Sequence, residues 1–336
     1  MINRICILAF LLPFFCLSQT LTGKIIDKET QQPLETVSVY FDNTTVGTTT
    51  NSNGDFSIDY TDAIRSPLVI SYLGYDRVII TDYRRKKYIT VELEPVSVLL
   101  DAVHVDNDDG LSRRQKLNLF RREFLGTSKF GRSCKILNED ALMLKYDQQS
   151  KSLYASASVP IVVENNDLQY QISYDIIDFE INFSYVNIRT REFLTNTATY
   201  IGTSFYKDLK KSHRKFAIKN REKAYKGSVQ HFMRSLFDKR LDQEGYWVFK
   251  KGFRINAYEA FTVLDLKDNQ DFKSVKLNTK VSILFDNNAQ SEMFIDVKEF
   301  YVDRYGNYTP IKGVFFSGFM GNQRVGDVLP LNYGLE

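Results

Sequence analysis

Cysteine is scarce in this chain of 336 residues, which holds three. Cys6 and Cys16 lie within the first eighteen residues, so Cys134 is the single cysteine of the remainder. A lone thiol cannot form an intramolecular disulfide, so no covalent cross-link is expected within the fold.

Histidine and the common catalytic motifs are also nearly absent. His104, His213 and His231 match no HExxH or other zinc-ligand spacing, and no G-x-S-x-G, Walker or G-x-G-x-x-G motif occurs. We therefore predict no catalytic residue, metal site or cofactor. A Cys134–His231 nucleophile pair is conceivable, but a small buried thiol is the more common role of such a cysteine. A carboxylate pair of the glycosidase kind stays open, because sequence spacing does not reveal spatial distance.

The composition is otherwise that of a globular protein rich in β-structure. Lys and Arg total 44 against 41 Asp and Glu, and a net charge of +3 argues against a nucleic-acid binder. Hydrophobic residues make up 43%, which excludes wholesale disorder. Phe (25) and Tyr (20) are abundant, which favours strands. The length suggests two domains.

Residues 1–18 read as a secretory signal peptide. Arg4 is followed by an apolar run from Ile5 to Leu17, too short to span a membrane, and small residues place the cut before Gln19. A buried N-terminal helix or a lipid anchor on Cys16 are alternatives, although bulky phenylalanines precede that cysteine. We therefore expect export to the periplasm, or an association with the outer membrane or cell surface.

Residues 20–105 form a series of short β signals separated by turns. Thr36–Phe41 and Phe56–Tyr60 alternate apolar and polar residues, and Asn53-Gly54 supplies a tight turn. Seven such segments at spacings near ten residues predict an antiparallel β-sandwich. Phe56, Ile58, Val69 and Tyr72 are expected to fill its interior.

Several motifs of this segment match a known family in order. They are Gly23-Lys24-Ile25-Ile26-Asp27, Pro33-Leu34 with Val37 and Val39, Gly47-Thr48-Thr49-Thr50 with Gly54 and Phe56, and Ser71-Tyr72-Leu73-Gly74-Tyr75. Together they resemble the carboxypeptidase regulatory-like domain, which implies a prealbumin-like or immunoglobulin-like sandwich. In Bacteroidota this domain begins many TonB-dependent receptors and other exported proteins. The resemblance implies structural roles and carries no catalytic residue to this chain.

Residues 106–111 are predicted to be a linker, because Asp106-Asn107-Asp108-Asp109-Gly110 is acidic and turn-forming. A calcium-binding EF-hand loop would need Gly and Glu where Leu111 and Leu117 stand, so that pattern fails.

Residues 112–336 are predicted to form an α+β, mostly antiparallel domain of unknown function. Ser112 can cap a helix over Arg113–Leu125 that Gly126 ends. Strands follow, including Leu153–Glu164, Leu168–Asp178 and Phe179–Arg189. One long amphipathic helix is expected from about Asn220 to Leu241, with Tyr225, Val229, Phe232 and Leu236 on its packing face.

The segment from Lys207 to Lys226 is the one conspicuous block of charge. It holds nine cations and two acids, and it is a candidate surface for an anionic partner such as lipid headgroups or glycans, with nucleic acid disfavoured. A solvated loop leading into a helix is the plainer interpretation. The nine cations are Lys207, Lys210, Lys211, Arg214, Lys215, Lys219, Arg221, Lys223 and Lys226.

These observations favour an exported, non-catalytic protein of the cell envelope. Its sandwich would serve docking or stability, and its second domain would bind an envelope protein or an anionic envelope component. Two alternatives stay open: a hydrolase with a carboxylate site, which requires a deep pocket of converging Asp and Glu, and a component attached to the outer membrane. The sequence does not indicate the oligomeric state.

Overall fold

The computed structural model describes residues 19–62, 64–96, 109–267 and 271–335. The predicted signal segment, His104 and the first half of the predicted linker lie outside these residues. The chain divides into two compact units, Met1–Val39 with Thr48–Pro95 and Tyr40–Gly47 with Val96–Glu336. About 45% of the residues are in strands and 18% are helical, which confirms the mainly β prediction.

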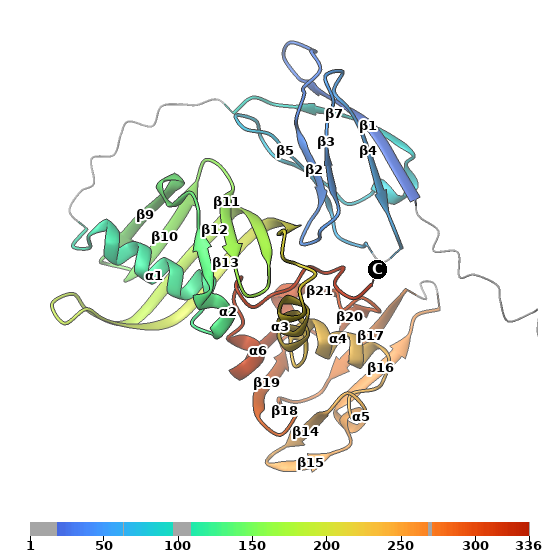
Figure 1. Ribbon diagram of the computed structural model, residues 1–336. Helices are drawn as coiled ribbons and strands as arrows, with labels where there is room; N and C mark the ends of the chain where they lie inside the picture. Colours follow the sequence, from blue (N-terminus) through green and yellow to red (C-terminus); the bar gives the residue numbers. More distant parts are fainter. Residues whose placement is uncertain (1–18, 63, 97–108, 268–270, 336) are drawn as a thin grey trace, which may run out of the picture. The chain divides into compact units, whose positions relative to one another are not determined.

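The first seven strands form the two sheets of a sandwich, in the orders β4-β1-β7 and β3-β2-β5-β6 (Figure 1). β1 pairs antiparallel with β4 but parallel with β7, so one pair departs from the antiparallel prediction. A short 3-10 turn, η2 (Tyr83–Arg85), precedes the last strand. The strands are β1 (Gln19–Asp27), β2 (Ser38–Phe41), β3 (Gly47–Thr49), β4 (Asp55–Tyr60), β5 (Leu68–Ser71), β6 (Val78–Ile80) and β7 (Tyr88–Leu93).

The interior of this sandwich holds most of the residues that the sequence assigned to it. Phe56, Ile58 and Val69 are buried as predicted, whereas Tyr72 is half-buried and packs on Tyr75 at 5.3 Å between ring centroids. Gly54 has a φ of +75°, and a Cβ there would lie 2.4 Å from the carbonyl oxygen of Ile25. Only glycine fits this turn without strain.

The second unit begins with helix α1 (Arg113–Leu125), whose bounds agree with the prediction. Ser112 caps the helix: its side chain accepts from the backbone N–H of Gln115, whose own side chain bonds the N–H of Ser112. The predicted linker ends in an anchored residue, because the Asp109 carboxylate lies 2.8 Å from the buried Lys116 ammonium. Asp109 is therefore part of the fold of this unit.

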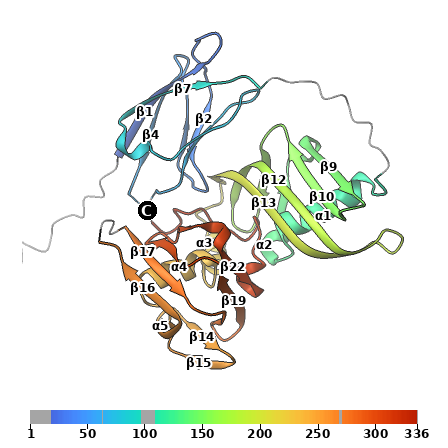
Figure 2. The same ribbon diagram turned by 180° about the vertical axis from the view of Figure 1, so that it is seen from behind.

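A six-stranded antiparallel sheet follows, in the order β8-β11-β12-β10-β9, with β13 paired along the other edge of β12. Helix α1 lies across one face of this sheet (Figure 2). Phe120 and Phe124 on the helix pack on Phe179 of the sheet, with centroid distances of 4.7 and 6.1 Å. The elements are α2 (Lys129–Arg132), β8 (Cys134–Ile136), η3 (Glu139–Ala141), β9 (Leu142–Asp147), β10 (Ser152–Ala157), β11 (Ile161–Asn165), β12 (Tyr170–Asn187) and β13 (Glu192–Asp208).

Two strand boundaries differ from the prediction. The expected strand Leu153–Glu164 is two strands, and Pro160, which has no N–H to donate, lies between them. The two strands expected over 168–189 are one long strand, β12, in which the pairing shifts by one residue between Ile176 and Asp178. A bulge of this kind lets a strand bend without ending.

The rest of the second unit comprises two antiparallel sheets, β15-β14-β18-β19-β22 and β16-β17-β20-β21, and helix α4. Phe232 of α4 contacts Tyr246, Phe261 and Phe316, which come from both sheets. The elements are α3 (Lys215–Tyr225), α4 (Val229–Phe237), β14 (Tyr246–Lys250), β15 (Phe253–Ile255), α5 (Ala257–Ala260), β16 (Phe261–Asp265), β17 (Phe272–Leu277), β18 (Val281–Phe285), β19 (Ala289–Ile295), β20 (Phe300–Asp303), β21 (Tyr308–Thr309), η4 (Ile311–Gly313), β22 (Val314–Ser317) and α6 (Gly318–Gly321).

The single long helix predicted over 220–241 is wrong, because α3 and α4 are separate. Gly227 has a φ of +79°, which ends the first helix in a left-handed residue. Ser228 then caps the second, accepting from the backbone N–H of His231 at 3.1 Å. Val229, Phe232 and Leu236 of the predicted packing face lie together on α4, whereas Tyr225 ends α3. The glycine is a helix stop signal and the serine that follows it is a helix start signal, so the chain forms two helices.

The second unit has two hydrophobic clusters, one around Phe120 and Phe124 of α1 and one around Phe232 of α4. The C-terminal segment contacts elements of both. Val325 donates its N–H to the carbonyl of Phe124, and the Arg234 guanidinium donates to the carbonyls of Leu331 and Tyr333. No helix within the described ranges is long and apolar enough to cross a membrane.

Candidate functional site

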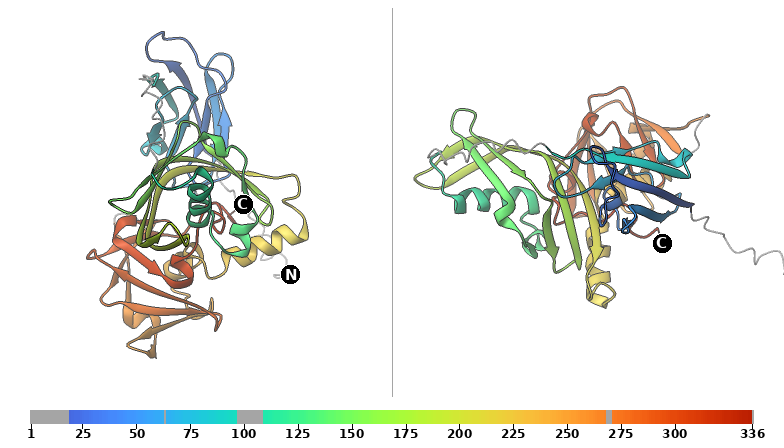
Figure 3. Two further views of the ribbon diagram at one scale, coloured as in Figure 1. Left: turned by 90° about the vertical axis from the view of Figure 1, so that its left-hand side faces the viewer. Right: turned by 90° about the horizontal axis from the view of Figure 1, so that it is seen from above.

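The basic segment, residues 207–226, runs from the end of β13 through a turn into α3. The helix buries one face, on which Ala217, Asn220 and Ala224 lie. Figure 3 shows α3 (yellow) extending past the neighbouring strands of its own unit in both views. The opposite face and the preceding turn are left to solvent, and most of the cations lie there.

Arg221 and Lys226 differ from the other seven cations, because each forms an ion pair within the protein. Arg221 faces the protein, donates to the carbonyls of Leu168 and Gln169 at 2.8 and 3.0 Å, and pairs with Asp208 at 2.6 Å. Lys226 pairs with Glu222 at 2.7 Å, and the hydrogen bond from this pair raises the pKa of the lysine. Arg221 therefore anchors the helix instead of facing a partner.

The other seven cations form an open group, here called the basic surface. All seven are exposed, and within the described residues none of them forms an ion pair or a side-chain hydrogen bond. Seven positive charges without local partners attract an anionic surface over about a Debye length, ~8 Å at physiological salt. They are Lys207, Lys210, Lys211, Arg214, Lys215, Lys219 and Lys223.

Two apolar side chains lie among these cations. Phe216 and Ile218, in the first turn of α3, are 43% and 53% exposed. Neighbouring positions on a helix point about 100° apart, so the two flank the outward face that carries Lys215 and Lys219. The sequence pattern gave no reason to single out Ile218, because its exposure depends on which helix face the protein covers.

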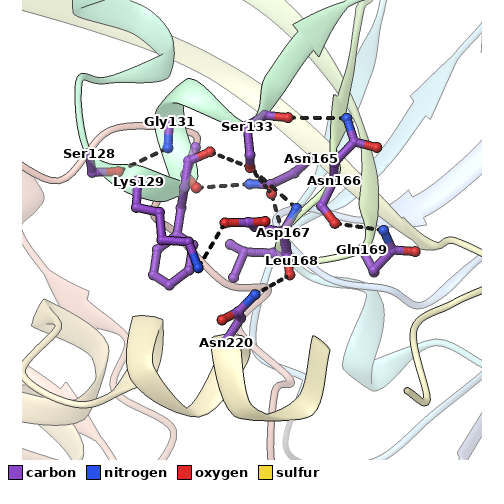
Figure 4. A network of polar contacts seen from close by, with 12 residues as sticks. Ser128, Lys129, Gly131, Ser133, Asn165, Asn166, Asp167, Leu168, Gln169 and Asn220 are labelled. Atoms are coloured by element: carbon purple, nitrogen blue, oxygen red, sulfur yellow. Dashed lines mark hydrogen bonds and ion pairs between the residues drawn. The ribbon is translucent and has the colours of Figure 1, made fainter. Parts of the chain in front are cut away.

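A network of polar contacts connects the buried face of α3, through Asn220, to the turn between β11 and β12 (Figure 4). The turn between β11 and β12 accepts a bond from Asn220, whose amide lies 3.0 Å from the carbonyl of Asp167. Lys129 of α2 pairs with the Asp167 carboxylate at 3.3 Å. The buried Asn165 bonds the Ser133 hydroxyl and the backbone of Leu168. These bonds fix one short helix, one turn and α3 relative to one another.

A second polar group lies beside this network. The buried Asp327 carboxylate accepts from the Ser128 hydroxyl and, at 3.1 Å, from the backbone N–H of Arg324. Burial raises the pKa of Asp327, and these bonds lower it in part. Burial together with the negative charges of Asp327 and Asp167 raises the pKa of the Cys134 thiol to about 12. The thiol, which is half-buried, is therefore protonated at neutral pH.

His231 occupies an aromatic cage formed by Tyr225, Tyr246 and Phe285. Its Nδ1 accepts from the N–H of Gly227 at 3.1 Å and lies 2.9 Å from the Tyr246 hydroxyl. Nε2 therefore carries the proton and faces Glu244 at 3.4 Å. Burial lowers the pKa of His231, and the Glu244 carboxylate only partly opposes this. Among the described residues no contact joins His231 and Cys134: the thiol donates to the carbonyl of Phe130, and the His231 ring contacts Tyr225, Tyr246 and Phe285.

An open depression elsewhere in the second unit is lined by two carboxylates, Asp242 and Glu259, together with Arg254, Ile255 and Asn256. Within the described residues no group of three His, Cys, Asp or Glu side chains is placed to hold a metal ion. A hydrolase site requires convergent carboxylates in an enclosed pocket, and this open surface does not supply that enclosure.

Comparison with known proteins identifies the first segment. Residues 21–105 match the family described as CarboxypepD_reg-like domain, which confirms the resemblance read from the motifs. The match covers about a quarter of the chain. The search of curated proteins finds no match.

Two solved structures give weak similarities over longer stretches. A protein of unknown function from Bacteroides fragilis NCTC 9343, named as a candidate membrane-associated protein, is 11% identical, with 90% of this chain and 95% of that chain covered and a TM-score of 0.20. A 9R-lipoxygenase from Cyanothece PCC8801 is 12% identical, with 66% and 48% covered and a TM-score of 0.19. At these scores neither similarity carries a functional argument.

Proposed function

We propose that this chain is an exported, non-catalytic protein of the cell envelope that docks on an anionic lipid surface through the basic surface and α3. One observation carries the proposal: two exposed apolar side chains in the first turn of α3 lie in a segment with seven exposed cations, three on the helix and four in the chain before it. Cations attract anionic headgroups, and each lysine or arginine near such a surface contributes about 1 kcal/mol.

The two apolar residues favour a lipid over a soluble anion or a glycan. Phe216 and Ile218 gain nothing from a solvated anion, whereas insertion between acyl chains removes their side chains from water. A fully buried side chain of this size contributes about 1.5–3 kcal/mol. Basic attraction and shallow insertion together give the reversible attachment typical of peripheral proteins.

The CarboxypepD_reg-like domain serves in this proposal as a docking or stability module. Support comes from the residues that its family motifs contribute, since Gly54 forms a turn and Phe56, Ile58 and Val69 fill the sandwich. None of these side chains is available for chemistry.

Vesicle sedimentation of the chain from residue 19 onward tests the proposal. We expect binding to phosphatidylglycerol vesicles, little binding to phosphatidylcholine vesicles, and release at about 0.5 M NaCl, where screening is strong. The double variant Lys215→Gln/Lys219→Gln is expected to bind about 30-fold more weakly, because two lysines contribute roughly 2 kcal/mol. Lys145→Gln/Lys151→Gln, which removes two exposed lysines elsewhere, is the matched control.

Insertion is tested separately. Phe216→Ser/Ile218→Ser is expected to weaken vesicle binding at least tenfold, because two buried apolar side chains contribute more than about 1.4 kcal/mol. Phe253→Ser/Ile311→Ser, at sites 78% and 70% exposed on other elements, should leave binding unchanged. Equal binding to both vesicle types would contradict the proposal, and insensitivity to the Phe216/Ile218 change would contradict insertion.

A further inference from the structure

Strand β13 lies at the edge of its sheet. One side pairs with β12 along its whole length. Within the described residues the other side is bridged only near its end, where Thr44 of the same unit forms a parallel bridge with Phe205. Among the described strand pairings, none covers that side of β13 before this bridge.

The occupied end shows which backbone groups face this edge. Ser204 receives the N–H of Asn43 on its carbonyl at 2.7 Å and donates its own N–H to the Asp42 side chain at 2.7 Å. Tyr206 donates its N–H to the carbonyl of Thr44 at 2.9 Å. Backbone direction in a strand alternates with period two, so Gly202, Tyr200 and Ala198 also direct their N–H and C=O groups to this edge.

The stretch lacks the usual protection of an edge strand. Phe193 to Tyr206 contains no charged residue and no proline, although natural edges are commonly blocked by lysine, proline or a bulge. One bulge is present, because Asn196 is the extra residue between two paired positions of β13. The stretch that runs from this bulge residue to the bridge is Asn196–Gly202, here called the free edge.

We propose that the free edge pairs antiparallel with the same edge of a second copy of this chain, across a two-fold axis at Thr199. This proposal is independent of lipid docking. With this axis the regular pairs run from Thr197 to Ile201, Gly202 lies opposite the bulge residue Asn196, and the ladder ends there because the bulge and the bridge bound the free edge. Outward-directed Ala198 then meets outward-directed Tyr200, as an antiparallel ladder requires.

The side chains are self-complementary in this register. On the exposed face Thr199 meets its own copy and Thr197 meets Ile201, which are β-branched pairs that favour sheets. On the core face small Ala198 meets large Tyr200, and both side chains are only half-buried within one copy. No like charges meet, so the free edge is compatible with a second copy of itself, as an isologous contact requires.

The molar mass of the chain from residue 19 onward, measured by light scattering over a concentration series, tests the pairing. We expect a dimer. Ala198→Pro removes an N–H that faces the edge and leaves the β12 ladder intact, so it is expected to give a monomer. Thr199→Lys places two lysines opposite each other on the exposed face and should do the same, whereas Ser156→Lys, exposed on β10, should leave the dimer intact.

Cysteine cross-linking tests the register. Thr199→Cys should form a disulfide between copies, since directly opposed Cβ atoms lie about 4.5–5.5 Å apart. Thr197→Cys should not, because its copy lies four residues along the ladder, at roughly 13 Å. A monomeric native chain, or a dimer that both Ala198→Pro and Thr199→Lys leave intact, would overturn the proposal. Cross-linking through position 197 but not 199 would overturn this register.

Discussion

The Arg221 guanidinium lies over the ring of Tyr170, with 3.6 Å between its central carbon and the ring centroid. Tyr170 begins β12, and Arg221 lies on α3, so this contact joins the basic segment to the large sheet. The pattern of charge in the sequence assigned Arg221 to the partner-binding group. Its side chain, 11% exposed, instead holds the helix that presents the other cations.

Arg221→Ala is expected to lower the free energy of unfolding by about 2 kcal/mol or more. The change removes the side-chain donor to the carbonyl of Leu168, one of the two donors to the carbonyl of Gln169, and a cation–π contact. Urea unfolding followed by circular dichroism measures it. Lys223→Ala, at an exposed site on the same helix, should stay within about 0.5 kcal/mol. Equal effects of the two changes would contradict an anchoring role for Arg221.

Gly227→Ala is expected to destabilise more than Gly252→Ala. Both glycines have a positive φ, +79° and +84°, so both changes place a side chain in the left-handed region at about 1–2 kcal/mol. A Cβ at residue 227 would also lie 2.7 Å from Cδ1 of Phe285, whereas nothing lies within 4 Å at residue 252. The difference between the two unfolding free energies, which we expect to exceed about 1 kcal/mol, isolates this close approach. Equal decreases in the unfolding free energy would show that the Phe285 ring moves aside without destabilising the protein.

His231 should make stability fall with acid. Its folded pKa lies below the ordinary value of 6.5, because burial disfavours the charged ring. The unfolded chain therefore binds a proton first as the pH falls, and stability present above about pH 6.5 is lost below it. The loss cannot exceed about 1.4 kcal/mol per pH unit for one proton.

The pH dependence is measured as the unfolding free energy between about pH 7.5 and pH 5.5, the window around the unfolded pKa. His231→Gln should flatten the slope relative to the native chain, even if it lowers stability throughout. His213→Gln, at an exposed site, should retain the native slope. A slope that survives in His231→Gln would assign the acid sensitivity to other groups.

Cys134 should react slowly with thiol reagents in the folded chain. Its pKa of about 12 leaves little thiolate near neutral pH, and the thiolate is the reactive species. Labelling of the chain from residue 19 onward with iodoacetamide, followed by mass spectrometry, should be slow in buffer and rapid in urea. Rapid labelling of the folded chain would show that the thiol is accessible and ionised.

The elements that local signals define were well predicted. Helix α1 has the predicted bounds because Ser112 and Gly126 act on neighbouring backbone groups. The sandwich follows from alternation and turn residues, each of which acts within a few positions. The break at Gly227 was also present in the sequence, but the continuous apolar stripe from Tyr225 to Leu236 outweighed it in the interpretation. Only the packing of Gly227 against Phe285 shows why the chain must turn there.

The sequence alone determined the composition, the order of strands and turns, the family of residues 21–105 and the presence of a basic segment. These are properties of single residues and their near neighbours. Only the tertiary structure decided that Arg221 is an anchor, that Phe216 and Ile218 remain exposed, and that no described strand pairs with β13 along Asn196–Gly202. Burial and pairing depend on residues far apart in the chain, and no local pattern encodes which of them meet.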